Sequence, residues 1–341
     1  MLVVLDGVRW QEVFDGADAV LASAAGTEAL DAAALMPHLH EVIAARGAAL
    51  GAPGRGAAIS ASGPNFVSLP GYSEIFTGRR DHACDDNDCP PTASPTLFDE
   101  ARAAATSPGD VAVFASWERI ARAAARVPGD IVVSTGRSRV YGDALLRGDA
   151  VASAWLAAGA SADPFPGHGD FRPDRFTAGL ALRYLETRRP RLAFIGLGEP
   201  DEYAHRGDYA GYLRSLSSAD AAIGQLFATL DRMGARGAHT TVFITSDHGR
   251  AHDYRFHGRE FPESARVWLV AAGPDVHARG FVRAEAPHRL ADIAPTLRRL
   301  LHLTADTAAS AGSPLEELFA PPPDRTAALT PRLMSVSDSS P

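Results

Sequence analysis

The sequence predicts an α/β fold in which helices cover both faces of a mostly parallel central sheet. Short apolar segments alternate with amphipathic segments along most of the 341 residues, as parallel strands joined by helices do. Hydrophobic residues make up 46% of the chain and charged residues 22%, which is typical of globular proteins. Because no repeat or linker interrupts the alternation, we expect one catalytic domain over residues 1–304. A poorly ordered Ala-, Pro- and Ser-rich tail is expected over residues 305–341.

Each predicted strand is a short, mostly apolar run bounded by turn residues. The predicted strands cover residues 1–5, 57–60, 111–114, 131–134, 192–197, 240–244 and 267–271. The predicted helices have apolar residues at helical spacing, and some have Pro in the first turn or Gly near the end. They cover residues 37–49, 68–78, 95–105, 118–126, 174–188, 209–233 and 288–301. Residues 141–170 are richer in Gly, Ala and Pro and are predicted to form a small cap or insertion near the site.

The overall charge of the chain bears on its partners. The net charge is −8 and the isoelectric point is near 5.8, whereas a nucleic-acid surface would be basic. No window reaches the roughly 18 consecutive apolar residues that a membrane span needs. No signal peptide is visible in the sequence as given. Because the first strand begins at residue 1, the position of the true start and the question of export stay open.

Two cysteines, Cys84 and Cys89, enclose a short acidic stretch. A disulfide closing this loop requires an oxidising compartment, and a pair of reduced thiols is the alternative. The sequence leaves both open. The acidic residues between the cysteines do not follow the spacing of an EF-hand calcium loop.

The segment that follows the strand at residues 240–244 carries candidate metal ligands. Asp247 and His248 lie just beyond this strand, and His257 follows nine residues later. Carboxylate oxygen and imidazole nitrogen are common ligands of Zn²⁺-like ions. A single Asp-His pair is more often a polar turn, so the prediction of a metal site depends on what the other strand ends carry.

Two other predicted strands end in the same residue types. Asp6 follows the first strand, and Asp201 and His205 follow the strand at residues 192–197. Asp201 and His205 are four residues apart, so one helical turn would place both on one face. In an open α/β sheet, ligands bind at the carboxyl ends of strands. The six oxygen and nitrogen donors therefore predict two divalent ions, of the Zn²⁺ type, that share one site.

Ser68 stands at the start of a predicted helix, where backbone N–H groups and the helix dipole favour an anion. A Ser in this position is commonly an N-cap, and a nucleophile is the alternative. His252 and Asp253 lie between the predicted ligands. They either orient those ligands or belong to a solvated turn.

In order and spacing, these motifs resemble the alkaline phosphatase superfamily, particularly its branch of type I phosphodiesterases and nucleotide pyrophosphatases. The resemblance extends to the segment Asp292–Leu297, which is typical of the C-terminal end of that family. The matching motifs are Leu5–Gly7, Ser68–Gly78, Pro200–Gly207, Ser246–Gly249 and His257–Gly258. The resemblance implies an alkaline-phosphatase-like fold and a hydrolase that acts on a small-molecule phosphate ester.

The resemblance also assigns roles to individual residues. Ser68 would be the nucleophile that attacks phosphorus and forms a phospho-Ser intermediate, and an activated water would then hydrolyse that intermediate. Asn87 would contact a phosphoryl oxygen, with a plain loop residue as the alternative. The implied metal ligands are Asp201, His205 and His257 for one ion, and Asp6, Asp247 and His248, beside Ser68, for the other.

The chain departs from this branch at two points. The branch usually has Thr as its nucleophile, followed by Pro-Asn-His, where this chain has Ser68 and Pro70-Gly71-Tyr72. These differences weaken the assignment to the branch but not to the superfamily. Whether a diester or a monoester is the preferred substrate stays open.

Three other functions are weaker alternatives. Sulfatases need an Arg four residues after the modified Ser or Cys, and position 72 is Tyr. The related phosphoglycerate mutases carry a much larger insertion than the 132 residues that separate Ser68 from Asp201. A metal-binding protein without catalysis would have no need of the intact nucleophile.

Overall fold

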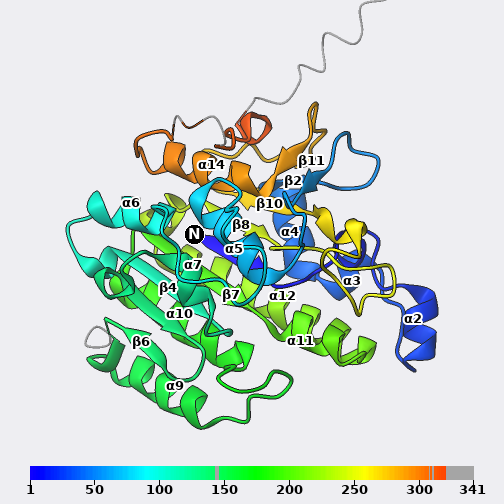
Figure 1. The fold of residues 1–341 in the computed structure, drawn as a ribbon, viewed down its shortest axis with the longest axis horizontal. Helices are drawn as coiled ribbons and strands as arrows, with labels where there is room; N and C mark the ends of the chain where they lie inside the picture. The colour runs from blue at the N-terminus through cyan, green and yellow to red at the C-terminus, as the bar shows by residue number, and fades with distance from the viewer. Residues whose placement is uncertain (143–145, 307, 309–310, 320–341) are drawn as a thin grey trace, which may run out of the picture.

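The computed structural model describes residues 1–142, 146–306, 308 and 311–319, and a nine-stranded sheet forms its centre (Figure 1). The strand order is β11-β2-β10-β8-β1-β7-β4-β5-β6, and three short strands form a second sheet in the order β12-β3-β9. The strands are β1 Leu2–Leu5, β2 Gly47–Leu50, β3 Ile59–Ser60, β4 Val111–Ala115, β5 Val132–Thr135, β6 Arg139–Tyr141, β7 Leu192–Leu197, β8 Val242–Thr245, β9 Arg266–Val267, β10 Leu269–Ala272, β11 Gly280–Phe281 and β12 His288–Arg289.

The middle of the large sheet is parallel. Strands β8, β1, β7, β4 and β5 all run in the same direction. Strand β10 is antiparallel to both of its neighbours, and β6 is antiparallel to β5 at the far edge. The predicted mostly parallel α/β sheet is therefore confirmed.

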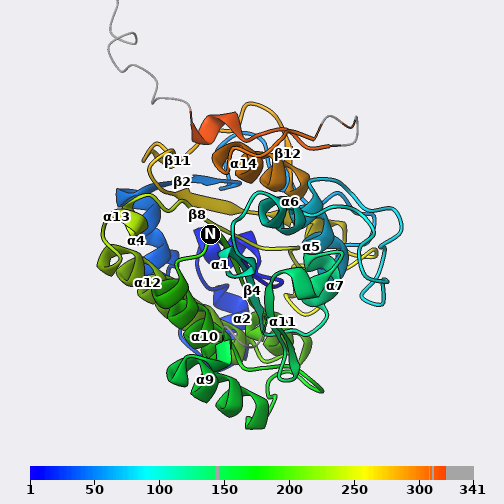
Figure 2. The same ribbon diagram turned by 90° about the vertical axis from the view of Figure 1, so that its left-hand side faces the viewer.

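Helices cover both faces of the sheet, as Figure 2 shows in a view turned by 90°. Helices α4, α10 and α12 lie on one side, and α5, α6, α7 and α14 on the other. The α-helices are α1 Trp10–Phe14, α2 Ala19–Ala24, α3 Ala32–Leu35, α4 Pro37–Ala45, α5 Ser68–Thr77, α6 Leu97–Ala103, α7 Ile120–Ala124, α9 Ala150–Ser161, α10 Asp174–Arg188, α11 Glu199–His205, α12 Tyr209–Arg232, α13 Ala235–Ala238 and α14 Ile293–Leu300.

Strand β1 shows how the sheet makes two cores. Val3 and Leu5 pack into the core on the α10 and α12 side, whereas Leu2 and Val4 pack into the core on the α5 side. Successive side chains of a strand point to opposite faces, so a strand between two helical layers must be apolar at every position. All four residues of β1 are buried, and this position at the centre of the sheet fixes where Asp6 emerges.

Two predicted helices are shorter than expected because part of each is a strand. The helix predicted at residues 37–49 ends at Ala45, and Gly47–Leu50 pairs with β10 as β2. The helix predicted at residues 288–301 begins at Ile293, because His288–Arg289 pairs with β3 as β12. Short segments such as Gly-Ala-Ala-Leu carry little preference of their own, and pairing with a neighbouring strand decides their structure.

The fold continues past the domain boundary predicted at residue 304. Leu315 and Leu318 are fully buried, and the backbone N–H of Leu315 donates to Thr296 Oγ1 of α14 at 3.0 Å. A short 3₁₀ helix, η5 Glu316–Leu318, lies in this segment. Residues 320–341 of the predicted tail lie outside the described residues.

The predicted cap at residues 141–170 contains α9, which follows the edge strand β6. Helix α9 packs on α10, with the ring of Trp155 at 5.9 Å from that of Phe176 in an edge-to-face contact. Residues 143–145 of the cap lie outside the described residues. The cap therefore rests on the helical layer next to β4, β5 and β7 rather than forming a separate domain.

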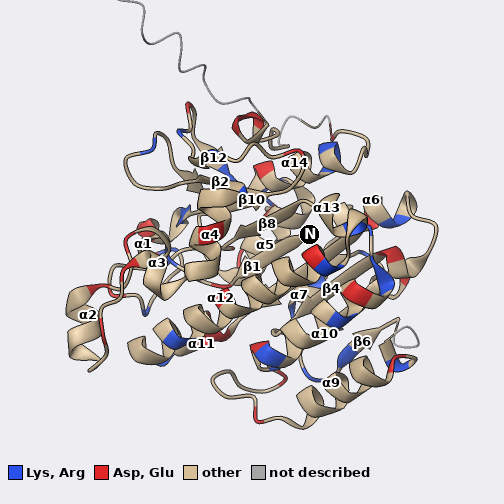
Figure 3. Cartoon of the chain, turned by 180° about the vertical axis from the view of Figure 1, so that it is seen from behind, with Lys and Arg blue, Asp and Glu red and all other residues tan. Residues whose placement is uncertain are grey.

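Acidic and basic positions are interleaved over the face of the molecule drawn in Figure 3. In the described part of the chain, no helix is both long and apolar enough to cross a membrane.

Candidate metal centre

Three neighbouring strands at the centre of the sheet end at the same edge and carry the predicted ligands. Strand β1 lies between β7 and β8, with Leu5 beside Leu197 and Val4 beside Thr245. Asp6 follows β1, Asp247 and His248 follow β8, and α11 follows β7 with Asp201 and His205 one turn apart. The parallel register thus brings Asp6 together with side chains that are more than 190 residues away in sequence.

The first group, which we call the buried half-site, consists of Asp6, Asp247 and His248. His248 Nε2 lies 3.6 Å from Asp6 Oδ1 and 3.5 Å from Asp247 Oδ2. Asp247 Oδ2 is buried without a hydrogen-bond partner among the described residues, whereas Asp247 Oδ1 accepts from the backbone N–H of Gly7 at 3.0 Å. A buried carboxylate oxygen without a donor is costly to ionise, and a bound cation would offset that cost, so this oxygen fits the role of a metal ligand.

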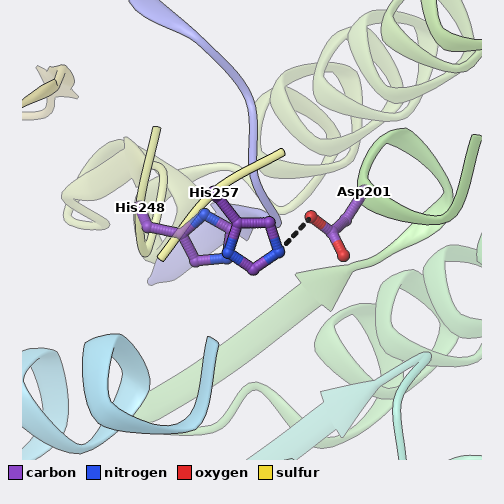
Figure 4. A group of neighbouring side chains, drawn as sticks. All are labelled: Asp201, His248 and His257. Atoms are coloured by element: carbon purple, nitrogen blue, oxygen red, sulfur yellow. Dashed lines mark ion pairs between the residues drawn. The ribbon is translucent and has the colours of Figure 1, made fainter. Parts of the chain in front are cut away.

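The second group, which we call the outer half-site, consists of Asp201, His205 and His257. His205 Nε2 lies 3.0 Å from both Asp201 Oδ2 and His257 Nε2. His257 Nε2 lies 3.9 Å from Asp201 Oδ1 (Figure 4). The rings of His257 and His248 are stacked at 4.1 Å, so the two half-sites adjoin. The structure thus brings all six predicted ligands together.

The ionisation of these groups suits metal binding. Burial lowers the pKa of His248 far below its usual value and lowers that of His257 to about 4, so both rings are neutral near pH 7. Burial raises the pKa of Asp247 to about 8, and the neighbouring Asp201 contributes in the same direction. Burial and Asp247 also raise the pKa of Asp6. Neutral imidazoles beside crowded buried carboxylates offer lone pairs and negative charge that a divalent ion would stabilise.

Ser68 is the first residue of α5 and faces the buried half-site. Its Oγ lies 3.3 Å from Asp6 Oδ1 and 3.3 Å from His248 Nε2. The N-cap position belongs to Val67, and the Ser68 side chain caps no helical N–H. The N-cap interpretation of Ser68 is therefore wrong.

Helix α5 fits closely against the strand end that carries Asp247. A Cβ atom at Gly71 would lie 2.4 Å from the backbone oxygen of Asp247, so only Gly allows this approach. Gly78 ends the helix in the left-handed conformation, as predicted. The motif from Ser68 to Gly78 is thus the segment that brings the hydroxyl to the metal ligands.

Asn87 lies beside the start of helix α5. The backbone N–H of Leu69 donates to Asn87 Oδ1 at 2.8 Å, and Cys84 and Cys89, on either side of Asn87, form a disulfide. A backbone N–H can only donate, so this contact identifies the amide oxygen and leaves the Asn87 NH₂ group for another partner. Asn87 and Ser68 both line a cavity of about 560 Å³ at the site.

Of the two residues between the ligands, neither reaches the site. His252 is exposed, and Asp253 Oδ1 accepts from the backbone N–H of Arg255 within an exposed turn. The solvated-turn interpretation therefore holds for both.

Two residues of the site were missed in the sequence. Tyr72 is fully buried and donates to Asp6 Oδ2 at 3.0 Å. Arg250 is also buried and forms an ion pair with Asp201. Burial alone would raise the pKa of Asp201, but Arg250 and His205 hold it well below the usual range. Tyr72 lies four residues after Ser68, one helical turn away, and Arg250 lies two residues after His248. This closeness to the predicted site residues was the only signal in the sequence for either residue.

Comparison with known families supports these observations. A family model described as the Metalloenzyme superfamily matches residues 177–305, the segment with five of the six ligands. A 2,3-bisphosphoglycerate-independent phosphoglycerate mutase of Gloeobacter violaceus is 28% identical over 145 residues, covering 39% of this chain and 26% of the mutase. The mutase of Prochlorococcus marinus is 31% identical over 150 residues, covering 42% of this chain and 27% of the mutase. The chain thus spans about a quarter of the length of the curated relatives it matches.

Solved structures match over nearly the whole chain. Alkaline phosphatase PafA superposes with a TM-score of 0.59 at 11% identity, covering 94% of this chain and 98% of PafA. Murine ectonucleotide pyrophosphatase/phosphodiesterase 5 gives a TM-score of 0.57 at 13% identity, covering 94% and 99%. A phosphonate monoester hydrolase of Silicibacter pomeroyi gives 0.58 at 14%, covering 95% and 77%.

The fold and the converging ligands define a metal-dependent enzyme of the α/β class. The chain shares the fold of alkaline phosphatase PafA and of the murine ectonucleotide pyrophosphatase/phosphodiesterase 5, and residues 177–305 match the Metalloenzyme superfamily.

Proposed function

We propose that this chain is a two-metal phosphodiesterase, similar to nucleotide pyrophosphatases, that forms a covalent intermediate on Ser68. The observation that carries the proposal is the position of Ser68 Oγ, 3.3 Å from both Asp6 Oδ1 and His248 Nε2. The six carboxylate and imidazole side chains suit two Zn²⁺ ions. When bound, such ions would lower the pKa of the Ser68 hydroxyl and offset charge on the phosphoryl oxygens.

Ser68, the N-terminus of helix α5 and Asn87 would carry out the other parts of the reaction. Ser68 Oγ forms a bond to phosphorus while the bond from phosphorus to the leaving oxygen breaks, and water then cleaves the phospho-Ser. Ser68 is the first residue of a ten-residue helix, whose N-terminal dipole favours negative charge at Oγ. The free NH₂ group of Asn87 donates to a phosphoryl oxygen, as an oxyanion-hole donor does.

The cavity beside Ser68 supports a diester as the substrate. Its volume of about 560 Å³ leaves room for a second ester group, and Trp117 and Phe171 give it aromatic walls. A monoester brings nearly two negative charges and needs cations, but the arginines of the cavity are already bonded. Arg119 pairs with Asp88 and donates to the Asn87 carbonyl at 2.6 Å, and Arg206 donates to two backbone carbonyls.

A nucleotide is the substrate class we favour. The partly exposed ring of Trp117 suits a nucleobase, which stacks on aromatic side chains. An inactive form of the murine neighbour was solved in complex with AMP, at 12% identity and a TM-score of 0.57. This comparison supports the proposal only through the shared fold.

The decisive test compares initial rates on bis(4-nitrophenyl) phosphate, 4-nitrophenyl phosphate and 4-nitrophenyl sulfate, with Zn²⁺ supplied. We expect the diester to be the fastest substrate, and Ser68→Ala to show how much of each rate depends on the site. Faster turnover of the monoester would indicate a phosphomonoesterase of the same superfamily, and turnover of the sulfate would indicate a sulfatase. Bound metal without turnover of any ester would indicate a metal-binding protein without catalysis.

A further inference from the structure

Arg250 is a buried cation that the proposed chemistry does not use. It follows His248 by two residues and is only 1% exposed. Its Nη1 donates to Asp201 Oδ1 in an ion pair. A guanidinium in the interior stays charged, so its position at a metal ligand has a physical consequence for that ligand.

Arg250 also bonds to the loop that carries His257. Its Nε donates to the Tyr254 carbonyl, and its Nη2 donates to the Arg255 carbonyl at 2.9 Å. Tyr254 has a φ of 62°, in the left-handed region that bulky residues rarely adopt, so surrounding contacts must hold it there. Because Arg255 is two residues before His257, these bonds hold the loop that carries His257, while the ring itself bonds through Nδ1 to the Phe66 carbonyl at 2.9 Å.

The two oxygens of Asp201 have different partners as a result. Oδ1 accepts from Arg250, whereas Oδ2 lies 3.0 Å from His205 Nε2. Gly7 leaves space for this arrangement, because a Cβ atom there would lie 2.4 Å from Asp201 Oδ1 and 2.7 Å from Arg250 Nη1. Three separate segments of the chain thus meet at one guanidinium.

The buried half-site has neutral donors in the equivalent role. Tyr72 donates to Asp6 Oδ2, and the backbone N–H of Gly7 donates to Asp247 Oδ1, both at 3.0 Å. Each of the three carboxylates therefore has one oxygen held by the protein and one oxygen left toward the centre. Only at the outer half-site does the donor carry a positive charge and also hold a ligand-bearing loop.

We propose that Arg250 is a positioning residue of the outer half-site, which holds the Asp201 carboxylate and the His257 loop in the geometry that binds a divalent ion. The proposal rests on the two-metal function proposed above. The charge of the guanidinium acts in the opposite direction, because it repels a second cation. Positioning is the larger effect here, since Arg250 bonds to both the carboxylate and the loop.

Zn²⁺ binding to metal-free protein tests the proposal directly. Equilibrium dialysis against Zn²⁺ buffers would give the affinities for wild type, Arg250→Gln and Arg250→Lys. The Lys variant keeps the charge but cannot make all three contacts, so it separates positioning from charge. We expect both variants to bind one of two ions about 10- to 100-fold more weakly, with the other ion unchanged.

Arg298→Gln is a matched control, because Arg298 is also a buried arginine paired with a carboxylate and a carbonyl. Its Nε donates to Glu100 Oε2 at 2.6 Å and its Nη2 to the Thr77 carbonyl at 2.9 Å, and it contacts no ligand. This variant should bind both ions as wild type does. Circular dichroism of each variant would verify the fold, and the Lys variant retains the test if Arg250→Gln does not fold.

Each outcome decides the proposal. Equal or tighter binding of both ions by Arg250→Gln would overturn it and leave Arg250 as a counter-charge only. Wild-type affinity in Arg250→Lys would overturn it as well, since charge alone would then suffice. A wild type that binds no pair of ions would instead contradict the proposed function.

Discussion

The two half-sites are built in different ways. The side chains of Asp6, Asp247 and His248 are 5%, 0% and 0% exposed, and two carboxylates meet one imidazole there. In the outer half-site Asp201 is 12% exposed and His205 is 47% exposed, and the Arg250 cation offsets the single carboxylate. One half-site is therefore part of the core of the sheet, whereas the other depends on a loop and faces the cavity. We expect the outer half-site to exchange its ion more readily.

Replacement of Ser68, the proposed nucleophile, should have the largest effect. Ser68 Oγ contacts Asp6 and His248 of the buried half-site, and Ser68→Ala removes the oxygen that we propose attacks phosphorus while leaving all six predicted ligands in place. Turnover should fall by several orders of magnitude, with both ions retained. Rapid acid quenching followed by peptide mass spectrometry should find phosphate on the Ser68 peptide of the wild type. Unchanged turnover in Ser68→Ala would exclude covalent catalysis.

Ligand substitutions should separate the half-sites next. Asp247→Ala and His257→Ala should each abolish turnover and lower metal content from about two ions per chain to about one. His205→Ala should keep some turnover at high Zn²⁺, because that side chain is half exposed and its two partners remain. Elemental analysis and initial rates would measure both effects. Equal losses in Asp247→Ala and His205→Ala would contradict the difference between the half-sites.

The stability of the metal-free protein should depend on pH through the buried half-site. Burial raises the pKa of Asp247 to about 8 in the folded chain, above its unfolded value of about 3.9. A carboxyl group with a raised pKa in the folded state contributes stability that is fully present at pH values below its unfolded pKa. This contribution is lost as the pH rises through the folded pKa of about 8.

Chelated protein should therefore melt at a temperature a few degrees lower at high pH than at low pH. Asp247→Asn should flatten this dependence, and Zn²⁺ should reverse it, because the ion competes with protons for the ligands. Differential scanning calorimetry across this pH range would measure the trend. The same slope in Asp247→Asn and in the unaltered chain would rule out the assignment to Asp247.

Opening the disulfide should have the smallest effect. Cys84 and Cys89 close the loop that places Asn87 against Leu69, but other contacts also hold this loop. The Asn65 side chain donates to the Asp85 carbonyl at 2.7 Å, for example. Reduction should therefore slow turnover by about tenfold or less, below the loss from removing an oxyanion donor outright. The control is a double Cys84→Ala, Cys89→Ala variant, whose turnover should not change when reductant is added. Loss of bound metal on reduction of the wild type would contradict the expectation.

The sequence predicted the parts of the molecule in which local pattern and tertiary structure agree. Helix α10 and strand β7 have the predicted bounds, because their apolar periodicity is uninterrupted. The six candidate ligands were predictable because the strand ends of a parallel sheet converge. Asp and His residues just after predicted strands could therefore be assigned to one site. The pairing of ligands into half-sites came from the family resemblance and not from spacing.

Other features depended on partners that are distant in sequence. The strand β2 forms through pairing with β10 and β11, both more than 200 residues away, and its own residues carry no clear preference. Tyr72 could be recognised as a donor to Asp6 only once α5 was placed against β1. The role of Arg250 likewise depends on Asp201 and on the path of its own loop, which a local pattern does not encode.

Part of the cavity wall comes from segments that supply none of the predicted ligands, although Asp6, Asp201 and His205 line the cavity as well. Trp117 and Arg119 follow β4, and Phe171 follows the cap, whereas the ligands follow β1, β7 and β8. If the proposed function holds, changes in this part of the wall would alter which leaving group is accepted and leave the six predicted ligands in place. Exchanging residues 117–119 and 168–171 between relatives should change substrate preference with few substitutions, because these segments line the cavity and contain none of the predicted ligands.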